Sequence, residues 1–255
     1  MIAPDTKVAL ITGAARGIGR GIAAQLIADG YAVMIADVRG EAAEQTAGEL
    51  ASGGGATAAC QADVADAEAC RAMVGRTVER FGRLDALVNN AGISKPQPSL
   101  EVPPEDWRRM IDIQLNGVFF CSQAAGRQMA AQGWGGVIVN ITSINAEAAF
   151  PQRASYVAAK AGVQMLTKVL AIEWAEHKIR VNAVGPAHTE TEMTLQHIRS
   201  GRIQIEALQK RIPLGRLASV QDVANAVSFL VSDKASFITG QSLYVDGGYL
   251  AFGYW

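Results

Sequence analysis

The chain has 255 residues, of which 49% are hydrophobic and 18% charged, and its formal net charge is −1. This length and hydrophobic content suffice for one large α/β domain with a substantial core. A nearly neutral chain gives no electrostatic reason to expect nucleic acid or an anionic membrane as a partner. No apolar run approaches the length of a membrane span, and the N-terminus lacks the pattern of a signal peptide.

The first predicted elements are a strand over residues 8–11, a glycine-rich turn and a helix that ends at Asp29-Gly30. Such a turn offers backbone N–H groups and a helix N-terminus to a phosphate. We expect Gly13 to permit the tight turn, Gly17 to let the backbone approach a pyrophosphate, and Gly19 to allow close helix–strand packing. The spacing is not Gly-x-Gly-x-x-Gly, so a plain glycine-rich connector is the alternative.

The second predicted strand, residues 32–36, is closed by Asp37 about eighteen residues after Gly19. A carboxylate at this position can accept hydrogen bonds from both hydroxyls of an adenosine ribose, and it would repel a 2′-phosphate. Arg16 and Arg39 argue weakly for NADP, since either could reach a phosphate. A carboxylate held at a strand end outweighs a flexible arginine, so we expect NAD as the cofactor.

A polar helix over about residues 40–52 leads to a third strand that ends at residues 61–64. Asp63 is expected either to contact adenine or to cap the next helix, residues 67–81. A fourth strand follows at residues 84–88. Alternating strands and helices of this kind imply right-handed βαβ units and a parallel sheet.

The three cysteines, Cys60, Cys70 and Cys121, have neither disulfide nor metal-ligand spacing. We therefore expect buried thiols, no metal site and a cytoplasmic location. The sequence shows no internal repeats or long low-complexity segments.

Residues 137–141 are predicted to be a buried strand, and Ser143 follows at its C-terminal end, where open α/β sheets bind ligands. Tyr156 and Lys160 are four residues apart, so both project from one face of a helix. An ammonium one turn away favours the phenolate, and the Ser143 hydroxyl could hold a substrate oxygen against it. The alternative is an exposed Tyr/Lys pair, since Tyr-x-x-x-Lys is common by chance.

Over essentially its full length, the chain resembles the classical short-chain dehydrogenase/reductase family. The motifs that match in order and spacing are Thr12-Gly13…Gly17-Ile18-Gly19, Asn89-Asn90-Ala91-Gly92, Ser143, Tyr156 with Lys160, and Asp246-Gly247-Gly248. The resemblance implies a single-domain Rossmann-type fold, a doubly wound parallel sheet flanked by helices on both faces. It also implies a nicotinamide cofactor and a dimer or homotetramer, of which we expect the homotetramer.

The resemblance assigns roles to individual residues. Tyr156 is expected to be the general acid/base, Lys160 to bind the nicotinamide ribose and lower the Tyr156 pKa, and Ser143 to orient the substrate oxygen. Thr189 and nearby backbone would hold the nicotinamide carboxamide. The expected cofactor-binding residues are Gly13, Arg16, Gly17, Ile18, Gly19, Asp37, Asp63, Val64, Asn90, Ala91, Gly92, Tyr156, Lys160, Pro186 and Thr189.

Gln114 is a departure from the family pattern, which has an asparagine at this position. In the family, that residue supports a water that relays protons to the catalytic lysine. A glutamine carries the same amide with one more methylene, so we assign the role to Gln114 as a fourth catalytic residue. A purely structural glutamine is the alternative.

Three expectations concern the C-terminal third of the chain. Residues from about 188 to 215 are expected to form a substrate lid whose closure excludes water. Ser219 is expected to cap a helix over residues 220–231, with Asp222 at its third position. The aromatic tail, residues 249–255, is expected either to reach a neighbouring subunit's substrate pocket or to seal a subunit interface.

The candidate substrate residues beside Ser143 and Tyr156 are polar: Asn145, Glu147, Arg153 and His188. Pockets for long acyl chains need an apolar lining, because stranded polar groups would cost affinity. These residues suit a polyhydroxylated substrate (a sugar, polyol or sugar acid), hence a role in carbohydrate metabolism. The alternative is that Glu147 pairs with Arg153 and His188 faces solvent.

Two rival functions share these motifs. A reductase of 3-oxoacyl thioesters, carried on acyl carrier protein or CoA, would prefer NADPH, against which Asp37 speaks. A catalytically idle cofactor-binding scaffold is the non-enzyme alternative. An altered Ser143, Tyr156 or Lys160 would have supported it, and none is altered.

Overall fold

The computed structural model of the chain describes residues 3, 5–199 and 204–253. The strands in this described part are β1 (Val8–Thr12), β2 (Ala32–Asp37), β3 (Thr57–Gln61), β4 (Ala86–Asn89), β5 (Gly136–Ile141), β6 (Ile179–Pro186) and β7 (Ser242–Val245). They form one sheet in the order β3-β2-β1-β4-β5-β6-β7, with every pair parallel. The chain adds β2 and β3 on one side of β1 and β4 to β7 on the other, and doubly wound sheets open a ligand crevice at such a switch in strand order.

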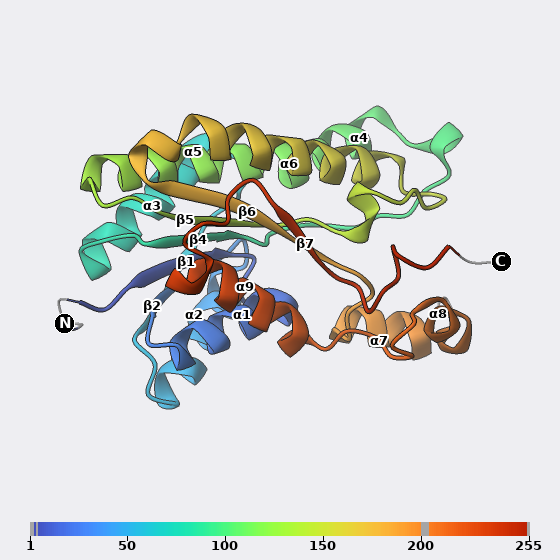
Figure 1. The fold of residues 1–255 in the computed structure, drawn as a ribbon, viewed down its shortest axis with the longest axis horizontal. Helices are drawn as coiled ribbons and strands as arrows, with labels where there is room; N and C mark the ends of the chain where they lie inside the picture. The colour runs from blue at the N-terminus through green and yellow to red at the C-terminus, as the bar shows by residue number, and fades with distance from the viewer. Residues whose placement is uncertain (1–2, 4, 200–203, 254–255) are drawn as a thin grey trace.

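Helices cover both faces of the sheet (Figure 1). One layer holds α1 (Gly17–Ala28), α2 (Gly40–Ser52) and α9 (Val220–Val231), and the other holds α3 (Ala67–Phe81), α5 (Gly117–Gln132) and α6 (Ala154–Glu173). The short helices are η1 (Ser99–Glu101), α4 (Pro104–Ile111), η2 (Asp112–Asn116), η3 (Ile144–Ala146), η4 (Ala175–His177), α7 (Glu192–Arg199), α8 (Ile205–Arg211) and η5 (Asp233–Ala235). The expected fold class is confirmed.

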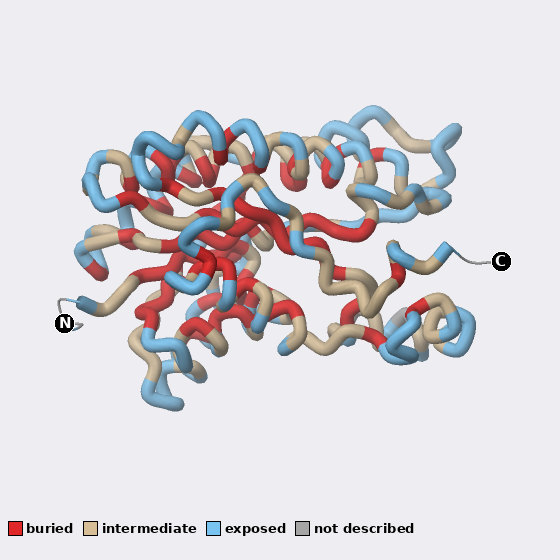
Figure 2. Tube along the Cα trace, viewed as in Figure 1, coloured by how far each residue is buried: buried red, intermediate tan, exposed pale blue. Residues whose placement is uncertain are grey.

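The sheet separates two hydrophobic cores. Successive strand residues point to opposite faces, so Leu10 packs against α3 and α5 while Ile11 packs against α1 and α9. The strands β1, β2, β4 and β6 are buried almost throughout (Figure 2), which is why they read as continuous apolar runs in the sequence, whereas the edge strands β3 and β7 are partly exposed. None of the described helices is long and apolar enough to cross a membrane.

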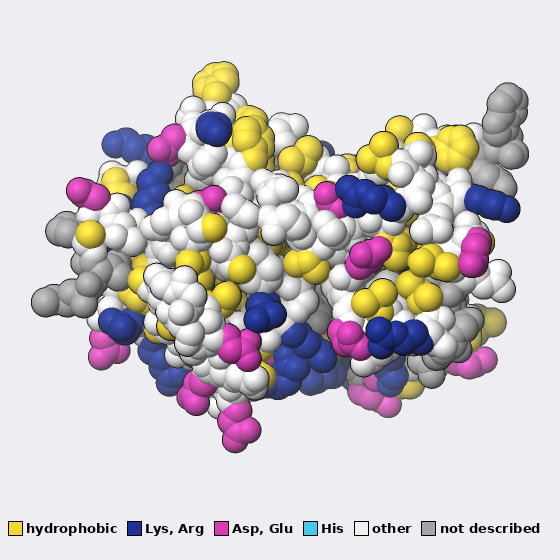
Figure 3. Space-filling model, turned by 90° about the horizontal axis from the view of Figure 1, so that it is seen from below, with side chains coloured by type: hydrophobic (Ala, Val, Ile, Leu, Met, Phe, Trp, Pro, Cys, Tyr) yellow, Lys and Arg dark blue, Asp and Glu magenta, His cyan; other side chains and the backbone are white. Residues whose placement is uncertain are grey.

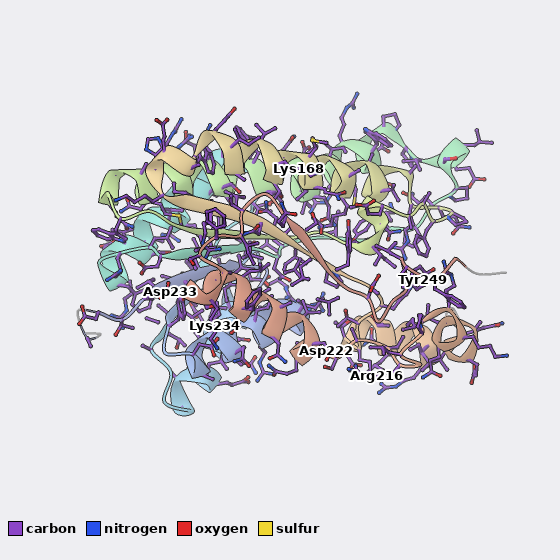
Figure 4. All side chains as sticks on the ribbon, viewed as in Figure 1. Lys168, Arg216, Asp222, Asp233, Lys234 and Tyr249 are labelled. Atoms are coloured by element: carbon purple, nitrogen blue, oxygen red, sulfur yellow. The ribbon has the colours of Figure 1, made fainter. Side chains whose placement is uncertain are left out.

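Helix ends follow local capping chemistry. The Ser219 side chain accepts from the Asp222 N–H and Asp222 accepts from the Ser219 N–H, the capping box that begins α9. Arg216 pairs with the same carboxylate, at 2.6 Å, and both residues are labelled in Figure 4. At α3 the cap is Asp66, which accepts from the Glu68 N–H. The reading of Asp63 as this cap is therefore wrong.

Helices α7 and α8, which fall in the segment expected to form a lid, lie beyond the C-terminal ends of β6 and β7 (Figure 1). On the face seen in Figure 3, basic and acidic side chains are interspersed rather than segregated. Strand β3 ends at Gln61, earlier than expected, because the Asp63 carboxylate accepts from the Ala65 N–H and turns the chain. Strand β6 extends beyond Val184 to Pro186 and so carries the chain up to the lid.

Candidate active site

Ser143, Tyr156 and Lys160 meet at the C-terminal end of β5. Ser143 lies two residues beyond the strand, and its Oγ accepts from the Asn145 N–H at 3.1 Å. Tyr156 lies in the first turn of α6 and shares a hydrogen bond with the Ser143 hydroxyl. The Lys160 Nζ lies 5.7 Å from the centroid of the Tyr156 ring. The Ser143 and Tyr156 hydroxyls can therefore act on one substrate oxygen, with Lys160 close to the Tyr156 ring.

The charges of this group are set by burial. Lys160 is only 5% exposed, and desolvation lowers its pKa to about 8. Its Nζ donates to the Ile141 carbonyl at 2.7 Å, which anchors it to the end of β5. Burial also raises the pKa of Tyr156, against the opposing effects of the Ser143 hydrogen bond and the Arg153 charge. Burial is the largest of these effects on the Tyr156 pKa, and the lowering of that pKa by Lys160 stays an expectation.

Gln114 lies in a π-helical turn, η2, that joins α4 to α5. It is 2% exposed, and its Nε2 donates to the Ile93 carbonyl at 2.5 Å. Its Oε1 is buried and has no partner among the described residues. A Cβ on Gly92 would lie 2.9 Å from that oxygen, so a glycine is required beside it. An unpartnered buried amide oxygen beside the glycine turn is suited to hold a water.

The turn after β1 has the geometry that the sequence indicates. Gly13 adopts a positive φ of 63°, and a Cβ there would lie 2.7 Å from the Ala91 Cα. A Cβ on Gly19 would lie 2.6 Å from the Gly13 carbonyl oxygen. The Asn90 side chain donates to the Thr12 and Gly13 carbonyls and so ties the β4 turn to this one.

The N-terminus of α1 fits the pyrophosphate of a dinucleotide. Arg16 is the N-cap residue, and no described side chain caps the helix or places an acidic group in its first turn. Its first N–H groups and the positive end of the helix dipole are therefore suited to bind an anion. The Thr191 side chain lies 3.8 Å from a Cβ built on Gly17, so the start of the lid faces the turn.

Asp37 is buried at the end of β2, but its carboxylate is already engaged. It accepts from the Ala15 N–H at 3.2 Å, the Arg39 N–H at 3.1 Å and the Arg39 Nε at 3.1 Å. The sequence placed Asp37 and Arg39 in competition for the cofactor. In the structure they form an ion pair with each other. The sequence did not predict this pair, because two residues that flank a strand end need not point the same way.

The candidate substrate residues separate into two groups. Arg153 donates to the Ser94 hydroxyl and places its guanidinium 5.9 Å from the Tyr156 ring centroid. Glu147 instead accepts from the Gln164 Nε2 at 2.6 Å and from the Tyr244 hydroxyl at 3.2 Å. The alternative in which Glu147 pairs with Arg153 is therefore wrong.

His188 lies on the chain that follows β6, and its Nε2 is buried without a partner among the described residues. Burial and the nearby Arg153 charge lower the pKa of His188, which favours a neutral ring. The alternative in which His188 faces solvent is therefore wrong. A buried ring nitrogen of this kind can exchange a hydrogen bond with a substrate hydroxyl.

Sequence reasoning did not single out two aromatic residues beside His188. The rings of Phe150 and Tyr249 are stacked, with centroids 6.0 Å apart and an interplanar angle of 26°. Both rings also meet His188 edge-on, at 6.2 and 6.1 Å. The sequence did point to the aromatic tail that contains Tyr249, but it gave no contact for that tail within its own subunit.

The remaining expected site residues lie near the same crevice or have structural contacts. Asn145 donates to the Ala148 carbonyl, and Thr189 is 5% exposed at the start of the lid. Val64 packs against Gly117 at the start of α5. Among the described residues, no group of His, Cys, Asp and Glu side chains could hold a metal ion.

Comparisons with known proteins agree with this geometry. A family model described as enoyl-(acyl carrier protein) reductase matches residues 13–250. The chain is 44% identical to the 3-oxoacyl-[acyl-carrier-protein] reductase FabG of Staphylococcus aureus, over 95% of this chain and 98% of that protein. It is 41% identical to a D-threitol dehydrogenase of Mycolicibacterium smegmatis, over 96% and 93% of the two chains.

The same fold occurs in a crystal structure described as a gluconate 5-dehydrogenase from Burkholderia cenocepacia in complex with NADP and tartrate. The TM-score is 0.92 at 38% sequence identity, with 97% of this chain and 96% of that chain covered. An acetoin dehydrogenase from Enterobacter cloacae superposes with a TM-score of 0.87 at 36% identity, over 98% and 97% of the chains.

Proposed function

Because the chain belongs to the short-chain dehydrogenase/reductase family, we propose that it transfers a hydride between NAD and a secondary alcohol or ketone. The proposed substrate is polar and polyhydroxylated: a sugar, a polyol or a sugar acid. The observation that carries this substrate class is the buried, unpartnered Nε2 of His188, close to the Arg153 guanidinium that lies over Tyr156. A substrate with several hydroxyls, or a carboxylate, would satisfy these groups on binding.

The proposed mechanism uses Ser143 and Tyr156 on one substrate oxygen. In the oxidative direction, the Tyr156 phenolate takes the hydroxyl proton while the Ser143 hydroxyl holds the oxygen in place. In the reductive direction, Tyr156 returns the proton to the developing alkoxide. Lys160 lies beneath the Tyr156 ring, where its positive charge would favour the phenolate whenever Lys160 is protonated. Gln114 would hold a water through its free Oε1.

A nicotinamide bound in the crevice would accept or return the hydride. The chain would hold its dinucleotide with the turn from Gly13 to Gly19, Asp37, the segment from Asn90 to Gly92, Lys160 and Thr189. We propose that residues 188–215 close over the bound pair as a lid, because water in the site would weaken every electrostatic contact there. Residues 200–203 of this lid lie outside the described residues.

Support for NAD comes from Asp37, whose carboxylate is held at the strand end where an adenosine ribose would lie. The Arg39 guanidinium is paired with that carboxylate, which weakens its claim to a 2′-phosphate. The gluconate 5-dehydrogenase relative was crystallised with NADP, so the two cofactors have to be compared directly.

A second function has a specific observation in its favour. Reduction of 3-oxoacyl thioesters is the printed activity of a relative that is 44% identical over nearly the whole chain. Ser143, Tyr156 and Lys160 would serve that reaction equally well. The apolar residues beside the site, Phe150, Ile144 and Tyr249, would then contact the acyl chain.

A steady-state screen of purified protein separates the two functions. We expect NAD-linked oxidation of one or more polyols, sugars or sugar acids, with a kcat/KM above that for a 3-oxobutanoyl thioester and NADPH. The reverse order would reject the proposed substrate class.

The cofactor assignment is tested by Asp37→Ala. This change should weaken NAD binding by about 1.5–3 kcal/mol, since charge-assisted hydrogen bonds to the ribose are lost, and NADP should gain relative to NAD. A wild-type enzyme that already prefers NADP would contradict the assignment.

A further inference from the structure

The segment after β7 folds back over its own subunit. The Asp246 carboxylate accepts from the N–H groups of Gly248 and Leu250, both at 2.9 Å, and thereby builds a tight turn. The turn directs Tyr249 inward, where the side chain is 9% exposed. Tyr249, labelled in Figure 4, lies on the same side of the molecule as α7 and α8. Its ring closes the aromatic group formed with Phe150 and His188.

The outer face of the Tyr249 ring is covered by the lid. Arg211, the last residue of α8, places its guanidinium 4.6 Å from the Tyr249 ring centroid and 5.5 Å from that of Phe252. The same guanidinium donates to the Phe252 carbonyl. One lid side chain therefore contacts the tail at two rings and at the backbone.

Backbone packing joins the lid and the tail a second time. The Leu214 N–H donates to the Gly247 carbonyl at 3.1 Å. A Cβ on Gly247 would lie 2.7 Å from the Ile212 side chain, and one on Gly248 would lie 3.0 Å from Pro213. Tyr249 also shares a small hydrophobic core with Ile212 and with partly buried residues of α7 and α8. Neither segment can move away from the sheet without disturbing the other.

From these contacts we infer that Tyr249 is a specificity-determining wall of its own subunit's substrate pocket and that Arg211 is the positioning residue that holds it. The inference rests on the proposed function, since the pocket it describes is the one that contains Ser143 and Tyr156. Three residues, Arg211, Tyr249 and Phe252, join the C-terminal tail to α8, and we call them the tail latch. The latch acts in cis, whereas the sequence left two other expectations open, that the tail reaches a neighbouring subunit's substrate pocket or that it seals a subunit interface.

The chemistry of the latch explains which changes should matter. A guanidinium on an aromatic face gains from the ring quadrupole and from buried area at once. Tyr249→Phe keeps the ring, whereas Tyr249→Ala removes the ring and with it the edge-on contact to His188. Arg211→Gln removes the cation, and Lys210→Gln is its matched control. Lys210 is the exposed neighbour on α8, and its ammonium forms no hydrogen bond or ion pair with another described residue.

The test measures KM and kcat for polyols, sugar acids and a 3-oxobutanoyl thioester, and measures the cofactor Kd separately by fluorescence titration. We expect Arg211→Gln and Tyr249→Ala to raise the substrate KM about tenfold while the cofactor Kd stays unchanged. Tyr249→Phe and Lys210→Gln should match the wild type. Hydrogen exchange should speed up in both 205–211 and 247–252 for Arg211→Gln, and in neither segment for Lys210→Gln.

An unchanged KM in Arg211→Gln, or faster exchange in only one of the two segments, would overturn the latch. The proposed function fails separately. If the wild type reduces only the thioester, the substrate class is wrong, and the KM comparison on the thioester still decides the latch. If the wild type turns over no substrate, the latch is tested by hydrogen exchange alone, from the rates of 205–211 and 247–252 in Arg211→Gln and Lys210→Gln.

Discussion

Burial moves the pKa values of Tyr156 and Lys160 in opposite directions, up for the phenol and down to about 8 for the ammonium. Each shift disfavours the charged form that the mechanism uses. A substrate oxygen hydrogen-bonded by Ser143 and a cofactor ribose beside Lys160 would offset part of this cost. The reaction should therefore depend on the complete site rather than on either residue alone.

Replacement of Tyr156 by phenylalanine tests the proposed acid/base. The ring and its packing remain, but the proton acceptor is lost, so kcat should fall by about 10²-fold or more while the cofactor Kd is retained. Stopped-flow or steady-state kinetics together with a binding titration would check both. In the wild type, oxidation should accelerate as pH rises, because the coupled Tyr156–Lys160 pair loses a proton. Near-normal turnover by Tyr156→Phe would refute the mechanism.

The depressed pKa of Lys160 also predicts how stability depends on pH. Between about pH 8 and pH 10.5 the unfolded state holds the proton that the folded state has released. The free energy of unfolding should therefore rise with pH in this window. Lys160→Met should be more stable than the wild type at pH 7, by on the order of 1–3 kcal/mol, and the difference should shrink towards pH 10.

Urea unfolding at both pH values measures this difference. Lys168→Met is the control, since Lys168 is an exposed lysine on the same helix. A stability difference between Lys160→Met and the wild type that is equal at pH 7 and pH 10 would contradict the prediction.

Residues that act through local spacing were predictable, and residues that act through distant contacts were not. The i,i+4 spacing brings Tyr156 and Lys160 together on any helix, and Gly13 is required by its own turn. The partner of Glu147 is Tyr244, almost a hundred positions later on β7. Such a pairing depends on the order of strands in the sheet, which periodicity does not encode.

At the scale of single elements, the helix ends agreed with the sequence better than the strand ends did. The bounds of α2, α3 and α9 agree with the ranges expected from the sequence, and the expected cap Ser219 does begin α9, although the cap of α3 is Asp66 and α2 has no side-chain cap. Strand β4 begins at Ala86 rather than Leu84, because Asp85 turns its carboxylate back to the Val8 N–H and to Arg83. Strand ends of this kind are set by side-chain contacts between elements.

The π-helical turn that carries Gln114 is the element least visible in the sequence. It adds a residue to the helix and presents the amide to the Ile93 carbonyl. Gln114→Leu keeps the volume but removes the amide. If Gln114 orients a relay water, kcat should fall about tenfold or more in this variant, and Gln114→Asn should restore much of it. A lower Tm with unchanged kcat in both variants would leave Gln114 a structural residue.

At the scale of the whole molecule, an apolar stripe on α6 is exposed in the single described chain. Met165, Val169 and Ile172 are 58%, 42% and 78% exposed on the outer layer of the sheet. We propose that this face forms the subunit interface of a homotetramer, where small exposed residues such as Ala158 and Ala161 let two helices approach.

Ile172→Glu tests this interface by adding a charge to the apolar stripe at its most exposed residue. The variant should elute as a smaller species than the wild type in size-exclusion chromatography with light scattering. Leu100→Glu is the control, because it adds the same charge at a fully exposed apolar residue on η1. A wild-type monomer, or an Ile172→Glu variant of unchanged mass, would contradict the proposal.

The position of β7 near the end of the chain affects the order in which the protein folds during translation. The strand completes the sheet beside β6, and Tyr249 follows it within a few residues. The nascent chain can form the cofactor half, β1 to β4, while the rest is still being translated. The proposed substrate pocket is complete only after Tyr249 has been translated. We therefore expect affinity for the dinucleotide to develop early in synthesis and selectivity among substrates to develop late. A chain stalled before Tyr249 would bind dinucleotide but would not discriminate between substrates.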